Sequence, residues 1–126
     1  MEFSSRRVAD VTVAAPVGQV DHRSAQDLQL ALTPILDESV AGRKPVVLDL
    51  SRVDYISSMG LRVLMMAAKQ MRAGNARIGV AALQPVVEEI FDIARFKHVL
   101  EAFPSVRAAL QEFSPAAAAA HDATEP

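Results

Sequence analysis

The stretch PVVLDLSRVDYISSMGLRVLMMAAKQMR, Pro45 to Arg72, contains the signals of a buried strand followed by a helix. Its first six residues form a short apolar run with β-branched side chains. Such a run is typical of a strand that is covered on both faces of a sheet. The second half predicts a helix from about Met59 to Arg72, which ends near Gly74 and Asn75. The stretch therefore predicts an α/β fold, in which strands alternate with covering helices.

Further elements are predicted on both sides of this unit. Strands are expected at residues 1–7, 10–15, 76–83 and 99–102, and helices after a cap at Ser24, from Pro85 and from Pro104 to about Phe113. The order β-β-α-β-α-β-α-β-α implies a mostly parallel or mixed sheet. Residues 114–126 contain five consecutive alanines and no apolar face, so this tail is predicted to be disordered.

Length and composition narrow the class of protein. The chain has 126 residues, 51% of them hydrophobic and 22% charged, which fits one globular domain. Lys and Arg are scattered and the net charge is −2, which argues against nucleic-acid binding. The absence of cysteine excludes disulfides and thiol catalysis. No signal peptide or long apolar run is visible, so a cytoplasmic location is expected.

The adjacent serines Ser57 and Ser58 stand at the predicted start of the second helix. Ser58 immediately precedes Met59, so one interpretation is a helix N-cap, which contributes about 0.5–2 kcal/mol. A cap accounts for one serine only. It also leaves Gly60 unexplained, because glycine in a helix interior costs about 1 kcal/mol relative to alanine. Glycine here favours a close approach of another molecule to the backbone.

Two catalytic interpretations of this region are weak. A nucleophile elbow requires a first glycine where Ile56 stands, and its partners could only be Asp92 and His98 or residues of the tail. Carboxylates that follow strands resemble the phosphoacceptors of response-regulator receivers, but the acidic pair and the lysine of those proteins are missing. Turn and cap roles are favoured for these carboxylates, which are Asp21, Asp49 and Asp54.

No metal or cofactor site is predicted. The three histidines, His22, His98 and His121, are far apart and lack metal-ligand spacing. All five glycines are isolated, so no phosphate-binding glycine loop is present.

A phosphoacceptor serine is the other interpretation. A helix N-terminus offers free N–H groups and a partial positive charge, and phosphoserine would add about −1.5 to −2 charges there. On the helix that follows, Met59, Val63 and Met66 gather beside Gln70 on the face that should be polar. Either another element covers this face, or it is a partner-binding patch. The opposite face is predicted to be core and contains Leu61, Leu64, Met65, Ala68 and Met71.

The stretch from Val46 to Arg72 resembles the signature of STAS domains, the anti-sigma factor antagonists. GQVDHRSAQDL, residues 18–28, is similar to the family segment that opens the first helix, and residues 76–110 resemble the C-terminal half. The resemblance covers about Met1 to Gln111. It implies a single STAS domain at residues 1–113, with a mixed sheet of four or five strands and helices mainly on one face.

The resemblance implies a partner-switching protein that is not an enzyme. In that family the unphosphorylated antagonist binds an anti-sigma factor that is also a serine kinase, and phosphorylation releases it. The kinase brings ATP and magnesium, a metal-dependent serine phosphatase resets the antagonist, and the antagonist needs no cofactor. Ser58 aligns with the target serine, and Asp21 with a family aspartate near it. The partner-binding residues are expected to be Asp21, Ser57, Met59, Gly60, Val63 and Met66.

The sequence departs from the family pattern at two positions. Ser57 stands where many members have an aspartate, and Met59 stands where many have a small residue. Ser57 is therefore the alternative acceptor to Ser58. An alternative function is that of a STAS subunit of a lipid-transport ABC system, in which the domain is a permanent structural partner.

Overall fold

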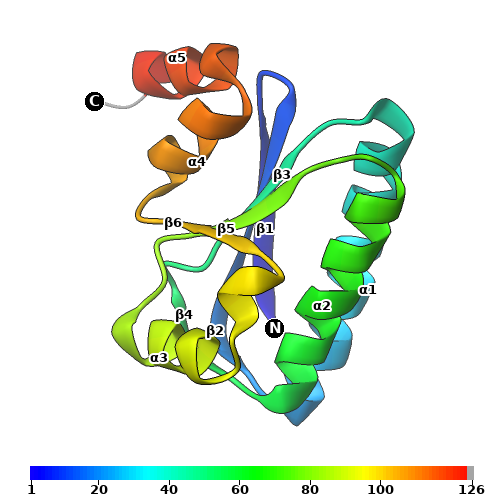
Figure 1. Ribbon diagram of the computed structural model, residues 1–126, viewed down its shortest axis with the longest axis vertical. Coiled ribbons are helices and arrows are strands. Elements are labelled where there is room, and N and C mark those ends of the chain that lie inside the picture. Colours follow the sequence, from blue (N-terminus) through cyan, green and yellow to red (C-terminus); the bar gives the residue numbers. More distant parts are fainter. Residues whose placement is uncertain (125–126) are drawn as a thin grey trace.

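The structure is a computed structural model that describes residues 1–124, and it contains one sheet between two groups of helices (Figure 1). The strands are β1 (Glu2–Val8), β2 (Val11–Val20), β3 (Val46–Asp49), β4 (Val53–Ile56), β5 (Ile78–Ala81) and β6 (Glu101–Phe103). The helices are α1 (His22–Gly42), α2 (Ser58–Ala73), α3 (Pro85–Ile93), the 3-10 helix η1 (Phe96–His98), α4 (Val106–Phe113) and α5 (Pro115–Thr124).

The sheet is mixed, as predicted. Its main path has the order β1-β2-β3-β5-β6, and β4 pairs with β2 beside that path. The β1–β2 pair is antiparallel and all the other pairs are parallel. The main path has the five strands that the sequence predicts, and β4 is an additional, sixth strand.

Strand β2 is longer than predicted, because Pro16 and Gly18 do not end it. Gly18 has a φ of 99°, and the pairing register with β4 shifts between Gly18 and Gln19. Pro16 lies between the residues of β2 that pair with β3 and those that pair with β4. Its missing N–H therefore removes no hydrogen bond from the pairing of β2 with either of these strands. The bulge at Gly18 lets one strand serve two partners in succession.

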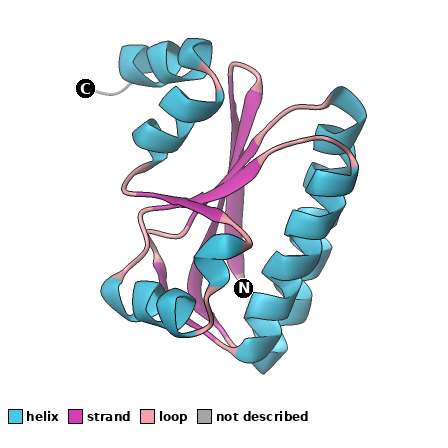
Figure 2. Ribbon diagram, in the orientation of Figure 1, coloured by secondary structure: helices cyan, strands magenta, loops and turns pink. Residues whose placement is uncertain are grey.

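The central strand β3 is buried on both faces, as predicted. Val46 and Leu48 belong to the core beneath α1, α2 and α3, whereas Val47 belongs to the core beneath α4 and α5. The alternation of side chains along a strand places them on opposite faces. Helices α1, α2 and α3, which contain most of the helical residues, thus cover one face of the sheet, and α4 and α5 cover the other (Figure 2).

The tail is not disordered between Ser114 and Thr124, where the prediction is wrong. Helix α5 buries Ala117 and Ala118 against the same core as Val8 and Val11 of the β1–β2 hairpin. Small side chains permit this close contact, although they give no recognisable amphipathic pattern. The last two residues of the predicted tail, 125 and 126, lie outside the described part.

Ser114 connects the two C-terminal helices and anchors them. Its hydroxyl donates a hydrogen bond to Asp10 Oδ1 at 2.6 Å and accepts one from the N–H of Ala117 at 3.2 Å. Arg107 of α4 forms an exposed ion pair with Asp122 of α5.

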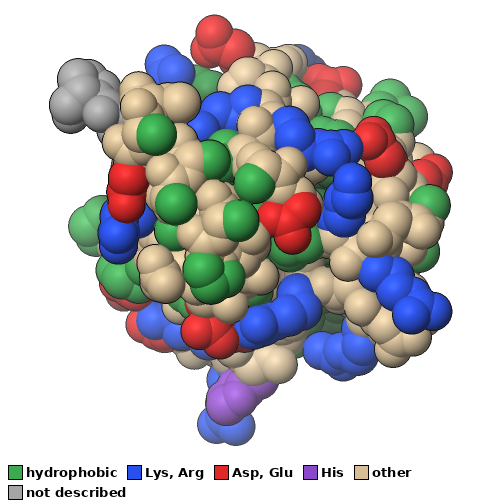
Figure 3. Space-filling model, turned by 90° about the horizontal axis from the view of Figure 1, so that it is seen from above, with side chains coloured by type: hydrophobic (Ala, Val, Ile, Leu, Met, Phe, Trp, Pro, Cys, Tyr) green, Lys and Arg blue, Asp and Glu red, His purple; other side chains and the backbone are tan. Residues whose placement is uncertain are grey.

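Seen from above, hydrophobic side chains gather on the side of α5, and basic side chains lie beside them (Figure 3). Within residues 1–124, no helix has the length and apolar character required to cross a membrane.

Candidate functional site

The candidate site lies where the parallel strands β2 and β4 end side by side. Gln19 pairs with Tyr55, and Val20 pairs with Ile56. Each strand leads into a helix after one residue, so α1 and α2 begin at the same edge of the sheet, at the lower end of Figure 1. The pairing of the strands therefore fixes the two helix N-termini next to each other.

Asp21 is the N-cap of α1, so the predicted cap at Ser24 is wrong. The carboxylate of Asp21 accepts hydrogen bonds at 3.0 Å from the N–H groups of Arg23 and Ser24. The hydroxyl of Ser24 accepts in return from the N–H of Asp21 at 2.9 Å, which completes a capping box. These bonds favour the charged carboxylate: the N–H of Ser24, followed by its hydroxyl, lowers the pKa of Asp21 below its ordinary value.

The two serines have different environments, and Ser57 rather than Ser58 is the N-cap of α2. The Ser57 hydroxyl accepts a hydrogen bond from the N–H of Gly60 at 3.2 Å. Ser58 is the first residue of the helix and is exposed. Among residues 1–124 its hydroxyl forms no hydrogen bond, so it lacks the hydrogen-bonded base of an activated serine nucleophile. One hydroxyl is thus used by the fold, and the other faces solvent.

Gly60 has a packing role that differs from the predicted one. A Cβ atom at this position would lie 2.7 Å from Val20 Cγ1 and 2.9 Å from Ile56 Cγ2. The residue is buried beneath the first turn of α2. The close approach that the glycine permits is therefore made by β2 and β4 of this chain. Contact of Gly60 with a partner stays a prediction.

An apolar surface follows Ser58 along α2. Met59 and Met66 are 40% and 54% exposed, and Val63 is half-buried. Helix α1 lies alongside and covers this face only in part, so the alternative that another element covers it holds only in part. The partner-binding patch stays a prediction. Met65, which the sequence places in the core, is exposed instead. The buried residues of α2 are Gly60, Leu64, Ala67, Ala68 and Met71.

This surface continues into a groove between α1 and α2. A recess of about 240 Å³ begins next to the first turn of α2 and is lined by Gln29, Met59, Arg62, Val63 and Met66. A second recess, of about 370 Å³, shares three of these residues and adds side chains farther along both helices. The two recesses form one groove, which we call the α1–α2 groove.

The α1–α2 groove contains functional candidates that sequence reasoning missed. Arg62 and Gln29 line it but were not predicted to belong to the site. Arg62 is exposed and makes no ion pair within residues 1–124. Its position four residues after Ser58 was a signal available in the sequence, because such residues are neighbours on a helix surface.

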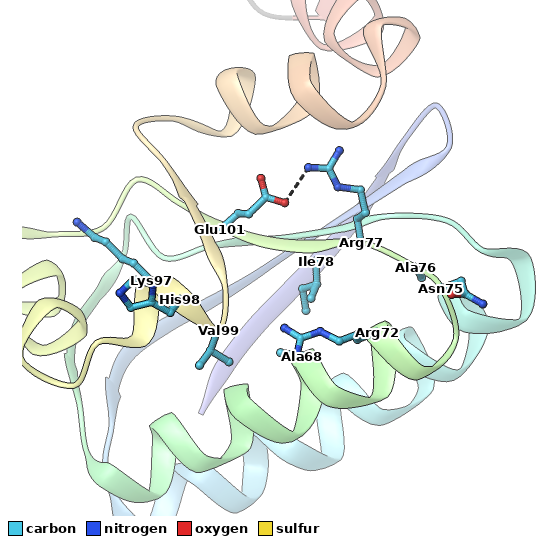
Figure 4. Close-up of a pocket in the computed structure, with 10 residues that line it drawn as sticks. All are labelled: Ala68, Arg72, Asn75, Ala76, Arg77, Ile78, Lys97, His98, Val99 and Glu101. Atoms are coloured by element: carbon cyan, nitrogen blue, oxygen red, sulfur yellow. Dashed lines mark hydrogen bonds and ion pairs between the residues drawn. The ribbon is translucent and has the colours of Figure 1, made fainter.

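A separate cavity of about 430 Å³ lies at the opposite end of α2, toward which Arg72 points (Figure 4). Its other basic side chains are largely neutralised, since Arg77 pairs with Glu101 at 2.7 Å and Lys97 with Glu88 at 3.1 Å. The described residues hold no cluster of three or more potential metal ligands. The described residues that line this cavity therefore do not form a recognisable binding site for an anion or a metal ion.

Comparison with known proteins gives a family and a fold. The model of the STAS domain matches residues 2–109. A relative from Bordetella bronchiseptica, BtrV, bears the name of an anti-sigma factor antagonist. It is 34% identical over 116 residues, which are 92% of this chain and 97% of BtrV.

Solved structures agree in fold. An anti-sigma factor antagonist (STAS) domain protein from Planctomyces limnophilus has a TM-score of 0.80 at 16% identity, with 89% of this chain and 97% of that chain covered. A protein from Thermotoga maritima described as an anti-sigma factor antagonist has a TM-score of 0.78 at 19% identity, with 88% and 93% covered. The family match over residues 2–109 and the 34% identity to BtrV show that the chain belongs to the STAS domain family.

Proposed function

We propose that this chain is an anti-sigma factor antagonist in a partner-switching pathway. It binds an anti-sigma factor with serine kinase activity while Ser58 is unmodified, and it is released when Ser58 is phosphorylated. A metal-dependent serine phosphatase then restores the binding form. Because the phosphate comes from ATP, the exchange takes place in the cytoplasm. The name and close length match of BtrV support the class of function.

The observation that carries the choice of acceptor is the contrast between the two serines. The Ser57 hydroxyl is engaged as the cap of α2 by the N–H of Gly60, so transfer to it would disturb a hydrogen bond of the fold. Ser58 is exposed at the first helical position, so a kinase can reach its hydroxyl without breaking a bond of the fold. Phosphate at this position also gains from the positive end of the helix dipole.

The partner surface extends from Ser58 along the exposed side of α2. Met59 and Met66 supply adaptable apolar contacts, and Val63 forms the floor between them. Asp21 lies at the adjoining edge, where its carboxylate is held by the capping box of α1. A dianion added next to these side chains changes the charge of the surface while leaving the core in place.

The protein acts in this scheme by binding, and its kinase performs the chemistry. Phosphoryl transfer needs ATP, magnesium and a group that positions the attacking hydroxyl, all of which the kinase supplies. The antagonist contributes an accessible hydroxyl on a rigid helix. No catalytic residue and no cofactor are therefore assigned to this chain.

Calorimetric titration with the cognate anti-sigma factor kinase tests this function. We expect wild type and Ser58→Ala to bind with similar affinity, and Ser58→Asp to bind at least tenfold more weakly. Ser57→Asp is the matched control, because aspartate is also a good N-cap and adds the same charge one residue away. Undiminished binding of Ser58→Asp would contradict the switch. Stable co-purification with a transporter ATPase instead of a kinase would favour the permanent subunit role.

A further inference from the structure

Arg62 occupies a position that links the Ser58 hydroxyl with the α1–α2 groove. It follows Ser58 by four residues on α2, so the two side chains lie on the same side of the helix, one turn apart. It also lines the recess that contains Met59 and Met66. Both Ser58 and Arg62 are exposed.

The direction of this pair favours contact. Side chains on a helix point back toward its N-terminus, so Arg62 points toward the turn that carries Ser58. An anion placed four residues before a cation is also the better order for a pair on a helix surface. No carboxylate within residues 1–124 forms an ion pair with Arg62, so a phosphate at Ser58 would meet no competing partner.

We propose that Arg62 is the internal receptor for the phosphate on Ser58, and that phosphorylation thereby withdraws a cation from the α1–α2 groove. This inference rests on the proposed function, in which Ser58 carries the phosphate. The guanidinium donates two parallel hydrogen bonds to phosphate oxygens, a geometry that lysine cannot reproduce. In the unmodified protein the same guanidinium is available to a carboxylate of the partner at the edge of the groove.

The pair gives phosphorylation two effects on one surface. The dianion repels an acidic partner directly, and it also occupies the arginine that would have paired with that partner. The apolar side chains Met59 and Met66 remain in place, so the groove changes its charge and keeps its apolar lining. Arg62 therefore makes the partner preference of the groove depend on the state of Ser58.

Other charged groups near the helix N-termini must be separated from Arg62 in any test. Asp21, His22 and Arg23 belong to the start of α1, and Asp54 belongs to β4. Arg23 is the alternative cation, because it lies in the first turn of the neighbouring helix. Lys69 is a more distant cation on α2 itself, almost two turns beyond Arg62.

The test uses the full chain with phosphoserine incorporated at position 58 during translation, so that it needs no kinase. Titration followed by ³¹P NMR gives the second pKa of the phosphate, which is ordinarily about 6. We expect Arg62→Gln to raise this pKa by about 0.3, a twofold change in the proton dissociation constant. Arg62→Lys should raise it less, and Arg23→Gln and Lys69→Gln should leave it within error of the parent.

A second measurement, of side-chain NMR resonances, tests the same contact without relying on the pKa of the phosphate. The Nε–H resonance of Arg62 should shift when phosphoserine replaces Ser58, and the side-chain resonance of Lys69 should stay in place. An unchanged pKa in Arg62→Gln, or a larger change in Arg23→Gln, would overturn the assignment. The phosphate is introduced without a kinase. The test can therefore show that Arg62 does not bind the phosphate even if Ser58 is a kinase substrate, and that Arg62 binds it even if Ser58 is not.

Discussion

The N–H of Ser57 donates a hydrogen bond to the carbonyl oxygen of Val20 at 2.8 Å. This bond extends the pairing of β2 with β4 by one residue, up to the point at which both strands turn into helices. It places the cap of α2 directly beside the residue that precedes Asp21, the cap of α1. The candidate site is thus built on a pair of parallel strands, and its position does not depend on a flexible loop.

The different roles of the two serines predict different effects on stability. Ser57→Ala removes the acceptor for the N–H of Gly60 and should lower the free energy of unfolding by about 1 kcal/mol. Ser58→Ala removes an exposed hydroxyl without a partner and should change it by less than about 0.5 kcal/mol. Urea denaturation of both variants checks this. Ser57→Asp, which retains a capping oxygen, should be close to wild type, and equal losses in the two alanine variants would contradict the assignment of the cap.

Gly60→Ala should destabilise the protein although alanine is the better helix former. The new Cβ would lie 2.7 Å from Val20 Cγ1, and overpacking of this kind costs about 1–3 kcal/mol. Gly42→Ala is the matched control at the end of α1, because its nearest contact is a flexible lysine side chain at 3.4 Å. Thermal denaturation should show a clear loss for the first variant and little change for the second.

A double-mutant cycle with Val20→Ala identifies the cause of that loss. Alanine at position 20 removes the closest contact of the new Cβ. The double variant should therefore lose less free energy of unfolding than the two single variants lose together. Strict additivity would show that Val20 is not the obstacle to a side chain at position 60.

Asp21 should contribute stability that disappears in acid. Its pKa is lowered in the folded protein, chiefly by the hydrogen bond from the N–H of Ser24, so its contribution is present above the ordinary value of 3.8. It is lost as the pH falls through the lower folded pKa. Glu38 and Asp122 also have lowered pKa values, so the informative quantity is a difference between variants.

Asp21→Asn provides that difference, because asparagine keeps a capping oxygen but does not titrate. The gap in unfolding free energy between wild type and Asp21→Asn should shrink when urea titrations are repeated below about pH 3.8. A gap that is constant across the acid range would show that the charge of Asp21 is not stabilised by the cap.

Removal of α5 should lower the melting temperature. A stop after Ser114 uncovers the core that Ala117 and Ala118 share with Val8 and Val11. Asp122→Asn is the control, since it breaks only an exposed ion pair with Arg107, which is worth about 0–1 kcal/mol. A truncated chain with the melting temperature of wild type would show that α5 does not pack as described.

Much of this architecture could be predicted from local signals. The apolar run of β3 predicts burial on both faces, and Val46 and Val47 indeed contact different cores. Pro85 begins α3 at the position where proline is best tolerated. These features depend on neighbours in the sequence, and for that reason the sequence is sufficient to find them.

The errors concern features that depend on distant residues. Gly60 is a glycine because Val20 and Ile56 occupy the space of its Cβ, which no local pattern reveals. Helix α5 is ordered because Ser114 bonds to Asp10, more than a hundred residues away in the chain. A cap at Ser58 is one of the interpretations that the sequence allows, and the structure places the cap at Ser57 instead.

Mapping of the phosphate by mass spectrometry tests the central claim most directly. The full chain is incubated with its cognate anti-sigma factor kinase, ATP and magnesium, and the modified peptide is fragmented. We predict a single phosphate on Ser58 in the wild type and in Ser57→Asp, and none in Ser58→Ala. Phosphate on Ser57, or normal phosphate uptake by Ser58→Ala, would contradict the account.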